Sequence, residues 1–198
     1  MKPTYKGFEA KKSNGFVELP PVGAYIGEIQ AVHTVEFFGK EVVEMMVDIT
    51  EGEYKNRFHE VWEDQKERFG DKVQYRGIFR LIPYVEGDRE YVKTTFEGNL
   101  WCVEKNNPPY RWDWDENKLA GKKIGFSTRK CFYTGKDKDG NPVDRESIEI
   151  ARFELIDDVK AGRCKPTNPR DSRKKDGSAA TTDGSEFTDV SKEVSVPW

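Results

Sequence analysis

Cationic and aromatic side chains alternate at three places along this chain of 198 residues. A single nucleic-acid strand is bound by such a mixture, because aromatic rings stack on bases and cations neutralise phosphates. Each stacked base contributes about 1–3 kcal/mol, and the cations add a salt-dependent term that tolerates any sequence. The candidate contacts are Tyr54, Lys55, Arg57, His59 and Trp62 in a first group, Arg76 and Arg80 in a second, and Arg129, Lys130 and Tyr133 in a third.

These residue types also have structural interpretations. Trp62 fits a hydrophobic core, with Arg57 beside it in solvent. Arg76 and Arg80 fit a solvated strand face, or a face paired with some of the 36 acidic residues. The formal net charge of −3 gives no bulk electrostatic attraction to nucleic acid, so a cationic groove would have to be local.

Groups for catalysis or metal binding are few. The carboxylates of Asp113, Asp115 and Glu116 offer oxygen ligands for Mg²⁺, as a metal-dependent nuclease would need. Clusters of this kind are common by chance among 36 acids. Three scattered cysteines and two histidines do not form a zinc motif, and there is no Gly-rich phosphate loop or nucleophile elbow. We expect no catalytic residues, no metal and no cofactor, with a metal nuclease as the alternative.

A long β-hairpin must position the first group. Residues 23–32 and 41–50 each alternate between apolar and polar side chains, which predicts strands with one buried face. Gly39 supplies the turn between them. We expect the odd positions to face the core, and Glu28, Glu44 and Asp48 to face water. These acids would repel phosphate, so the groove must lie toward the hairpin's far end, or the alternation must switch at a bulge.

The remaining elements continue the pattern. Residues 57–62 read as a short strand or sheet extension, residues 63–72 as a charged loop, and residues 73–82 as a strand. Apolar residues at helical spacing predict a helix over 88–106, with Asp88 as its N-cap. Residues 121–134 and 147–157 read as the last strands, with Phe132 and Ile156 on their core faces. The order predicts a mainly β fold: a five-stranded, OB-fold-like antiparallel barrel with one helix between strands 3 and 4.

An aromatic-rich loop follows the helix and contains Arg111, Trp112 and Trp114. Stacking on bases is one interpretation of these side chains. We favour the other, in which the loop plugs the bottom of the barrel.

Both ends of the chain differ in composition from the middle. Residues 1–21 are polar and broken by glycine and proline, which predicts an arm over a domain of residues 22–162. Residues 163–175 contain six basic residues and one acid, whereas residues 176–198 contain five acids and one lysine. The second segment buries too little apolar surface to offset the entropy of ordering, so we expect it to be disordered, as the end of a flexible tail of residues 163–198.

Four strings resemble single-stranded-DNA-binding proteins encoded by bacteriophages and prophages. They are LPPVGAY (19–25), DITEGEYKN (48–56), EKNN with YRWDWD (104–107 and 110–115), and KLAGK (118–122). The resemblance covers roughly residues 19–165. It implies an OB-fold that coats single-stranded DNA during phage replication or recombination. It also implies a cytoplasmic location in a bacterial host cell, which agrees with the scattered cysteines and the lack of an apolar leader or membrane-spanning run.

The last residues, Val196, Pro197 and Trp198, are similar in kind to the acidic tails of bacterial single-stranded-DNA-binding proteins. Those tails end in proline and an aromatic residue and recruit replication or recombination proteins. Here Lys192 interrupts the acids, and tryptophan stands where phenylalanine is usual. The alternative function is an OB-fold interaction module of a replication complex that binds nucleic acid weakly. A monomer, a dimer and a tetramer are all compatible with this fold, and we expect no membrane partner.

Overall fold

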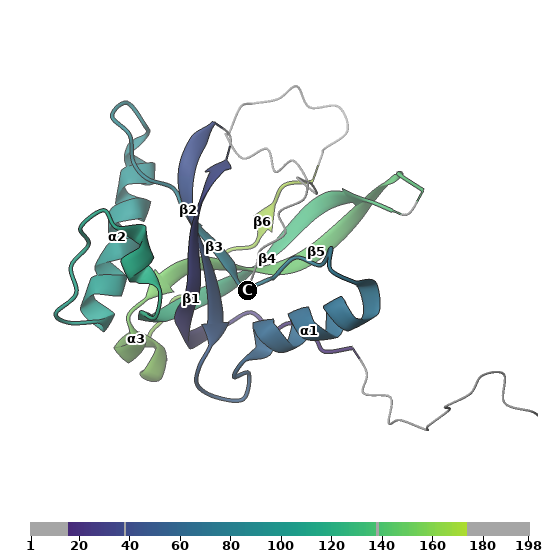
Figure 1. The fold of residues 1–198 in the computed structure, drawn as a ribbon, viewed down its shortest axis with the longest axis horizontal. Coiled ribbons are helices and arrows are strands. Elements are labelled where there is room, and N and C mark those ends of the chain that lie inside the picture. Colours follow the sequence, from purple (N-terminus) through teal and green to yellow (C-terminus); the bar gives the residue numbers. More distant parts are fainter. Residues whose placement is uncertain (1–15, 38, 138, 174–198) are drawn as a thin grey trace, which may run out of the picture.

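The computed structural model describes residues 16–37, 39–137 and 139–173. They form a mainly β structure built on one open, mixed sheet of six strands, as Figure 1 shows. The elements in chain order are β1 (Ala24–Phe37), β2 (Lys40–Ile49), α1 (Arg57–Phe69), β3 (Ile78–Leu81), α2 (Glu90–Asn106), the 3₁₀ helix η1 (Glu116–Leu119), β4 (Lys123–Lys136), β5 (Pro142–Glu154), α3 (Ile156–Lys160) and β6 (Arg170–Asp171).

The strands are ordered β3-β2-β1-β4-β5, and β6 pairs with β4. All pairings are antiparallel except that of β6, which is parallel. In Figure 1, α2 lies to the left of the β1–β2 hairpin, α1 to the lower right, and the β4–β5 hairpin projects to the right. The predicted helix between the third and fourth strands is therefore present as α2. Within the described ranges no hydrogen-bonded ladder joins β3 to β5, but Phe79 and Phe153 pack across that gap with ring centroids 4.4 Å apart.

The predicted hairpin is confirmed, and it contains a bulge. Ile29 pairs with Val47, but Ala31 pairs with Met46, so Gln30 has no partner in the register. An extra residue in one strand reverses which side chains face the core. Ile29 is fully buried before the bulge, and Val32 packs against the core after it. A bulge, one of the two alternatives that the acidic positions raised, is thus present in β1, although Glu28 precedes it and Glu44 and Asp48 lie on β2.

The core is formed by the sheet and α2, with Phe58 of α1 and Leu119 of η1. The helical spacing predicted for α2 is confirmed, because Phe96, Leu100 and Val103 are buried on one face. Asn99 is buried among them. Its side-chain oxygen accepts a hydrogen bond from the backbone N–H of Phe153 at 2.7 Å, which ties α2 to β5.

The prediction of a strand at residues 57–62 and of a charged loop at 63–72 is wrong, because α1 occupies residues 57–69. Phe58 and Val61, three positions apart, are its buried residues, and that spacing suits a helix. The prediction that Asp48 faces water is also wrong. Its side chain is buried, and its carboxylate binds the backbone N–H groups of Phe58 and His59, which stabilises the first turn of α1.

Smaller corrections concern the ends of elements. Arg89, not Asp88, is the N-cap residue of α2. The carboxylate of Asp88 instead accepts a hydrogen bond from the backbone N–H of Val85 and forms an ion pair with Lys40. Of the strand predicted for residues 73–82, only Ile78–Leu81 is a strand in the structure, as β3, which pairs with β2. Ile156 begins α3 instead of ending a strand, and β5 begins earlier, at Pro142. Phe132 is only half-buried, because a register shift between Ser127 and Thr128 turns Cys131 inward in its place.

The start of the expected tail is attached to the sheet. Arg170 and Asp171 pair with Cys131 and Phe132 of β4, and the Thr167 hydroxyl donates to the backbone carbonyl of Thr128 at 2.5 Å. Residues 163–173 therefore belong to the folded domain, contrary to the expected boundary at Gly162. Residues 174–198, with the predicted partner-binding end, lie outside the described residues, as do residues 1–15 of the predicted arm. Among the described helices, none is long and apolar enough to cross a membrane.

Candidate nucleic-acid interface

The first predicted group surrounds the start of α1, where the chain turns out of β2. Tyr54 is half-buried, packs edge-on against Tyr25, and carries the guanidinium of Arg57 at 5.4 Å from its ring centroid. Arg57 also pairs with Glu60 at 3.3 Å. The group therefore contains a cation held on a ring face, but the cation already has a carboxylate partner.

The next turn of α1 repeats this arrangement. The ring of His59 lies 5.8 Å from that of Trp62, and the ammonium of Lys66 lies 4.9 Å from the Trp62 ring. The Trp62 indole donates a hydrogen bond to the carbonyl of Val73 at 3.3 Å, which fixes the ring. His59 faces Glu63, with 3.3 Å between Nε2 and the carboxylate. Trp62 is thus a half-buried ring whose orientation is fixed by a hydrogen bond. It is less buried than the core interpretation requires and less exposed than the stacking interpretation requires.

The two arginines of the second group differ, because Arg80 has a carboxylate partner and Arg76 is exposed. Arg80 lies on β3 directly opposite Glu44 of β2, with 2.7 Å between their charged atoms, and its guanidinium lies 5.0 Å from the ring centroid of Phe37. Arg76 precedes the strand and is exposed. Lys55, at the start of α1, is exposed as well. Over residues 16–37, 39–137 and 139–173, neither Lys55 nor Arg76 forms an ion pair, so these two are the predicted cations most open to a phosphate.

The third group contains a carboxylate shared by two arginines. Glu149 on β5 binds Arg129 of β4 at 2.6 Å with one oxygen and Arg170 of β6 at 2.8 Å with the other. The three side chains are between 24% and 31% exposed. Two positive charges are therefore concentrated around one negative charge beside the β4–β6 pairing.

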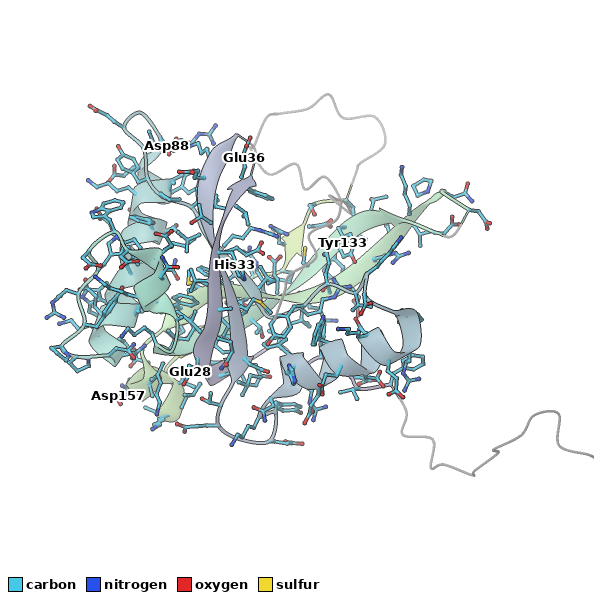
Figure 2. All side chains as sticks on the ribbon, in the orientation of Figure 1. Glu28, His33, Glu36, Asp88, Tyr133 and Asp157 are labelled. Atoms are coloured by element: carbon cyan, nitrogen blue, oxygen red, sulfur yellow. The ribbon has the colours of Figure 1, made fainter. Side chains whose placement is uncertain are left out.

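Lys130 does not lie on the same surface as Arg129 and Tyr133. Lys130 pairs with Glu146 at 3.5 Å, and both line a hollow of about 310 Å³ whose other wall is α1 at Val61 and Gln65. Arg129 and Tyr133 are an even number of residues apart, so they share the other face of β4. Tyr133 lies opposite Arg145 of β5. Figure 2 shows Tyr133 on β4, well away from Glu28, which lies at the end of β1 near Asp157.

Four side chains outside the three lists of candidate contacts join these groups. Phe37 lies under Arg80, and the half-buried ring of Phe132 lies 5.2 Å from the guanidinium of Arg173. Arg170 shares Glu149. The basic composition of residues 163–175 was the available signal for the two arginines. Alternation predicted Phe132 to be a core residue, whereas the irregularities in β1 and β4 leave both Phe37 and Phe132 only half-buried.

The loop of Arg111, Trp112 and Trp114 serves in part the structural role that we favoured. Trp112 packs against the core, and its backbone N–H donates to the carboxylate of Glu104 at 2.9 Å. Trp114, in contrast, is 70% exposed. Lys118 pairs with Asp113 and Asp115, and its hydrogen bond to Asp113 lowers the pKa of that carboxyl group. The described residues contain no cluster of three or more His, Cys, Asp or Glu side chains placed to hold a metal ion.

A comparison of the chain with protein-family models and another with curated proteins found no match.

Proposed function

We propose that this protein binds single-stranded DNA without sequence preference, on an OB-fold, in phage DNA replication or recombination. The observation that carries the proposal is the connectivity. Three antiparallel strands precede α2, the antiparallel pair β4–β5 and the short parallel strand β6 follow it, and β1 lies between β2 and β4 in the sheet. This is the order expected of an OB-fold, a partly open five-stranded barrel that binds oligonucleotides on one face. In this proposal the protein is a binding protein without a catalytic step.

The chemistry of the strand contacts supports the proposal. Four of the cations that lie over aromatic rings belong to or adjoin the three groups, namely Arg57 with Tyr54, Lys66 with Trp62, Arg80 with Phe37, and Arg173 with Phe132. A stacked base and its phosphate need the same two components side by side. Because these cations are held in place before a strand arrives, less side-chain entropy is lost on binding.

The ion pairs set the conditions for binding. Arg57, Arg80, Arg129 and Lys130 each have a carboxylate partner that a phosphate must displace. The Lys130–Glu146 pair is exposed, and such pairs contribute only about 0–1 kcal/mol, so that exchange costs little. The partners of Arg80 and Arg129 are less exposed, so their displacement costs more. The exchange predicts binding that weakens steeply with salt, since the phosphates also release their own counterions.

The tail completes the proposal. We propose that residues 196–198 bind replication or recombination proteins while the domain holds DNA, as the resemblance implies.

The second candidate is an interaction module of a replication complex with weak nucleic-acid binding. The pairing of four predicted cations and the net charge of −3 favour it.

Titration of the full chain with fluorescent oligo-dT and with duplex DNA, at two salt concentrations, separates the two candidates. The first predicts micromolar or tighter binding to oligo-dT, a preference over duplex, and weaker binding at the higher salt. Absence of binding to oligo-dT at low salt contradicts it and favours the module. Mg²⁺-dependent shortening of the oligonucleotide in the same samples would instead identify a nuclease.

A further inference from the structure

A pocket lined by aromatic rings lies between α2 and the loop that follows it. Its volume is about 380 Å³. It is separate from the three groups of predicted DNA contacts, and the connectivity argument does not use it. The lining side chains are Tyr84, Phe96, Glu97, Leu100, Trp101, Glu104, Trp112 and Trp114.

The rings of the pocket are unusually open to solvent. Trp101 is 49% exposed and Trp114 is 70% exposed. Trp114 stacks on Phe96 at 6.0 Å with 30° between the planes, and Trp112 lies 6.0 Å from Trp114 at 57°. Exposed apolar side chains that gather in one hollow mark a binding site more often than a structural accident.

The backbone holds Trp114 in this position at a cost. Its φ is 66°, in the left-handed region that a bulky residue rarely adopts. The neighbouring hydrogen bond from Trp112 N–H to Glu104 fastens the loop to α2. Strain that presents a large ring to solvent is typical of a ligand contact.

The charges of the lining indicate the kind of ligand. Glu97 and Glu104 are the charged lining side chains among the residues described, and both are acidic. Glu97 is exposed and enters no ion pair within the described ranges. Carboxylates beside aromatic faces attract a cation and repel a phosphate.

The chain itself places cations on two of these rings. The ammonium of Lys93 lies 5.9 Å from the ring centroid of Tyr84, and that of Lys105 lies 5.8 Å from the centroid of Trp101. Neither lysine lines the pocket. A ligand cation would take the place of these long, flexible side chains, with Glu97 and Glu104 as its counter-charges.

We propose that this pocket binds an arginine side chain from an exposed segment of a partner protein. A guanidinium is planar, so it stacks between rings while it donates to a carboxylate, and it is less strongly hydrated than an ammonium. Arginine is also a frequent main contributor to protein–protein affinity. This site goes beyond DNA binding, and it binds its ligand whether or not the protein binds DNA.

Indole N–H signals in ¹H–¹⁵N spectra of the full chain test the proposal. The probe is the blocked peptide Gly-Gly-Arg-Gly-Gly, with Gly-Gly-Glu-Gly-Gly as its control. The arginine peptide should shift the signals of Trp101, Trp112 and Trp114 at millimolar concentration, and that of Trp62 should stay in place. Glu97→Gln should weaken this binding about fivefold. The same charge change in the exposed loop, Glu86→Gln, should leave it unaltered.

Three results would overturn the proposal. They are equal shifts with the glutamate peptide, no shift with either peptide, and an effect of Glu97→Gln no larger than that of Glu86→Gln. If oligo-dT shifts the three indole signals and the arginine peptide does not, the pocket is a nucleobase site and the proposal is wrong. Because Glu97 is exposed, its substitution leaves the fold intact, and the dispersed amide spectrum of β1 and β4 checks this.

Discussion

The carboxylate of Asp48, at the end of β2, accepts a hydrogen bond from the backbone N–H of His59, 3.0 Å away in the first turn of α1. Its second oxygen accepts from the N–H groups of Phe58 at 3.1 Å and Ile49 at 2.8 Å. The first N–H groups of a helix have no partner within the helix, and a nearby negative charge also complements the helix dipole. One buried side chain on the sheet thus fixes where α1 begins, and with it the positions of Arg57, His59 and Trp62.

Replacement of Asp48 should destabilise the domain and loosen α1. Asp48→Ala leaves buried N–H groups without partners, which costs about 1–3 kcal/mol. Asp48→Asn keeps one acceptor oxygen and should cost less. Urea denaturation followed by circular dichroism measures both free energies of unfolding. Equal stability of Asp48→Ala and wild type would show that these hydrogen bonds do not hold α1.

The stability difference between wild type and Asp48→Asn should depend on pH. Burial raises the pKa of Asp48, and the three backbone N–H groups oppose this shift without cancelling it. The folded state therefore keeps the proton to a higher pH than the unfolded chain, in which the pKa is about 3.9. The resulting stabilisation is fully present below that unfolded value and is lost as the pH rises through the folded pKa. The advantage of wild type over Asp48→Asn should therefore be largest in acid and shrink toward neutrality, as urea midpoints across this range would reveal. A stability difference between wild type and Asp48→Asn that increases with pH would contradict a raised pKa of Asp48 in the folded state.

Removal of the charge on Glu149 should strengthen single-strand binding. Glu149→Gln removes the negative charge that Arg129 and Arg170 share, so this carboxylate no longer competes with phosphate at low salt. Fluorescence anisotropy with oligo-dT measures the change in affinity. Glu86→Gln makes the same change of net charge on an exposed loop and serves as the control. If both variants bind alike, Arg129 and Arg170 do not contact the strand.

Loss of the Trp62 ring should weaken binding at the α1 site. Trp62→Ala removes one stacking surface, which costs about 1–3 kcal/mol of binding free energy. Phe69→Ala removes an exposed ring, 67% accessible, from the end of the same helix and should leave affinity unchanged. Because Trp62 is half-buried, its variant must first be shown to remain folded at the assay temperature. Equal affinities of folded Trp62→Ala and wild type would return Trp62 to a purely structural role.

Arg80 should contribute to the salt dependence. If it meets one phosphate, Arg80→Gln should reduce the slope of log affinity against log salt by about 0.7. The slope is measured by oligo-dT titration at four or more salt concentrations. An unchanged slope would mean that Arg80 keeps its partner Glu44 and serves the sheet alone.

Deletion of residues 176–198 should tighten binding to oligo-dT at low salt. This segment contains five acids and one lysine, and residues 163–175 contain six basic residues, so the two attract each other. Removal of the acids exposes the basic run to DNA. Equal affinity of the shortened and full chains at low salt would dismiss such masking.

Sequence patterns predicted the elements whose side chains repeat along a single segment. The β1–β2 hairpin and α2 follow from alternation and from helical spacing, since each pattern reports which face of that segment is buried. The same method missed α1. Its apolar contacts are few and charged residues surround them, and its first turn depends on Asp48, which lies nine residues earlier than Arg57.

The candidate site was predicted as residue types, but not as a surface. The sequence selected Arg80 and Arg129 as cations and offered pairing with acids as an alternative for Arg80. It did not identify Glu44 and Glu149 as the partners, because these residues come from neighbouring strands. The bulge at Gln30 and the register shift after Ser127 decide whether Phe37 and Phe132 face the core. One inserted residue reverses a whole face, and a period-two pattern cannot place it.

The sequence by itself therefore determined a mainly β chain with a helix between its third and fourth strands, together with the residue types needed to bind a strand. Only the tertiary structure decided which cations are paired, that residues 163–173 belong to the sheet, and that Trp101, Trp112 and Trp114 surround one acidic pocket. The reason is physical. Burial periodicity is a property of one segment, whereas ion pairs, strand register and pockets are formed by side chains brought together from distant segments.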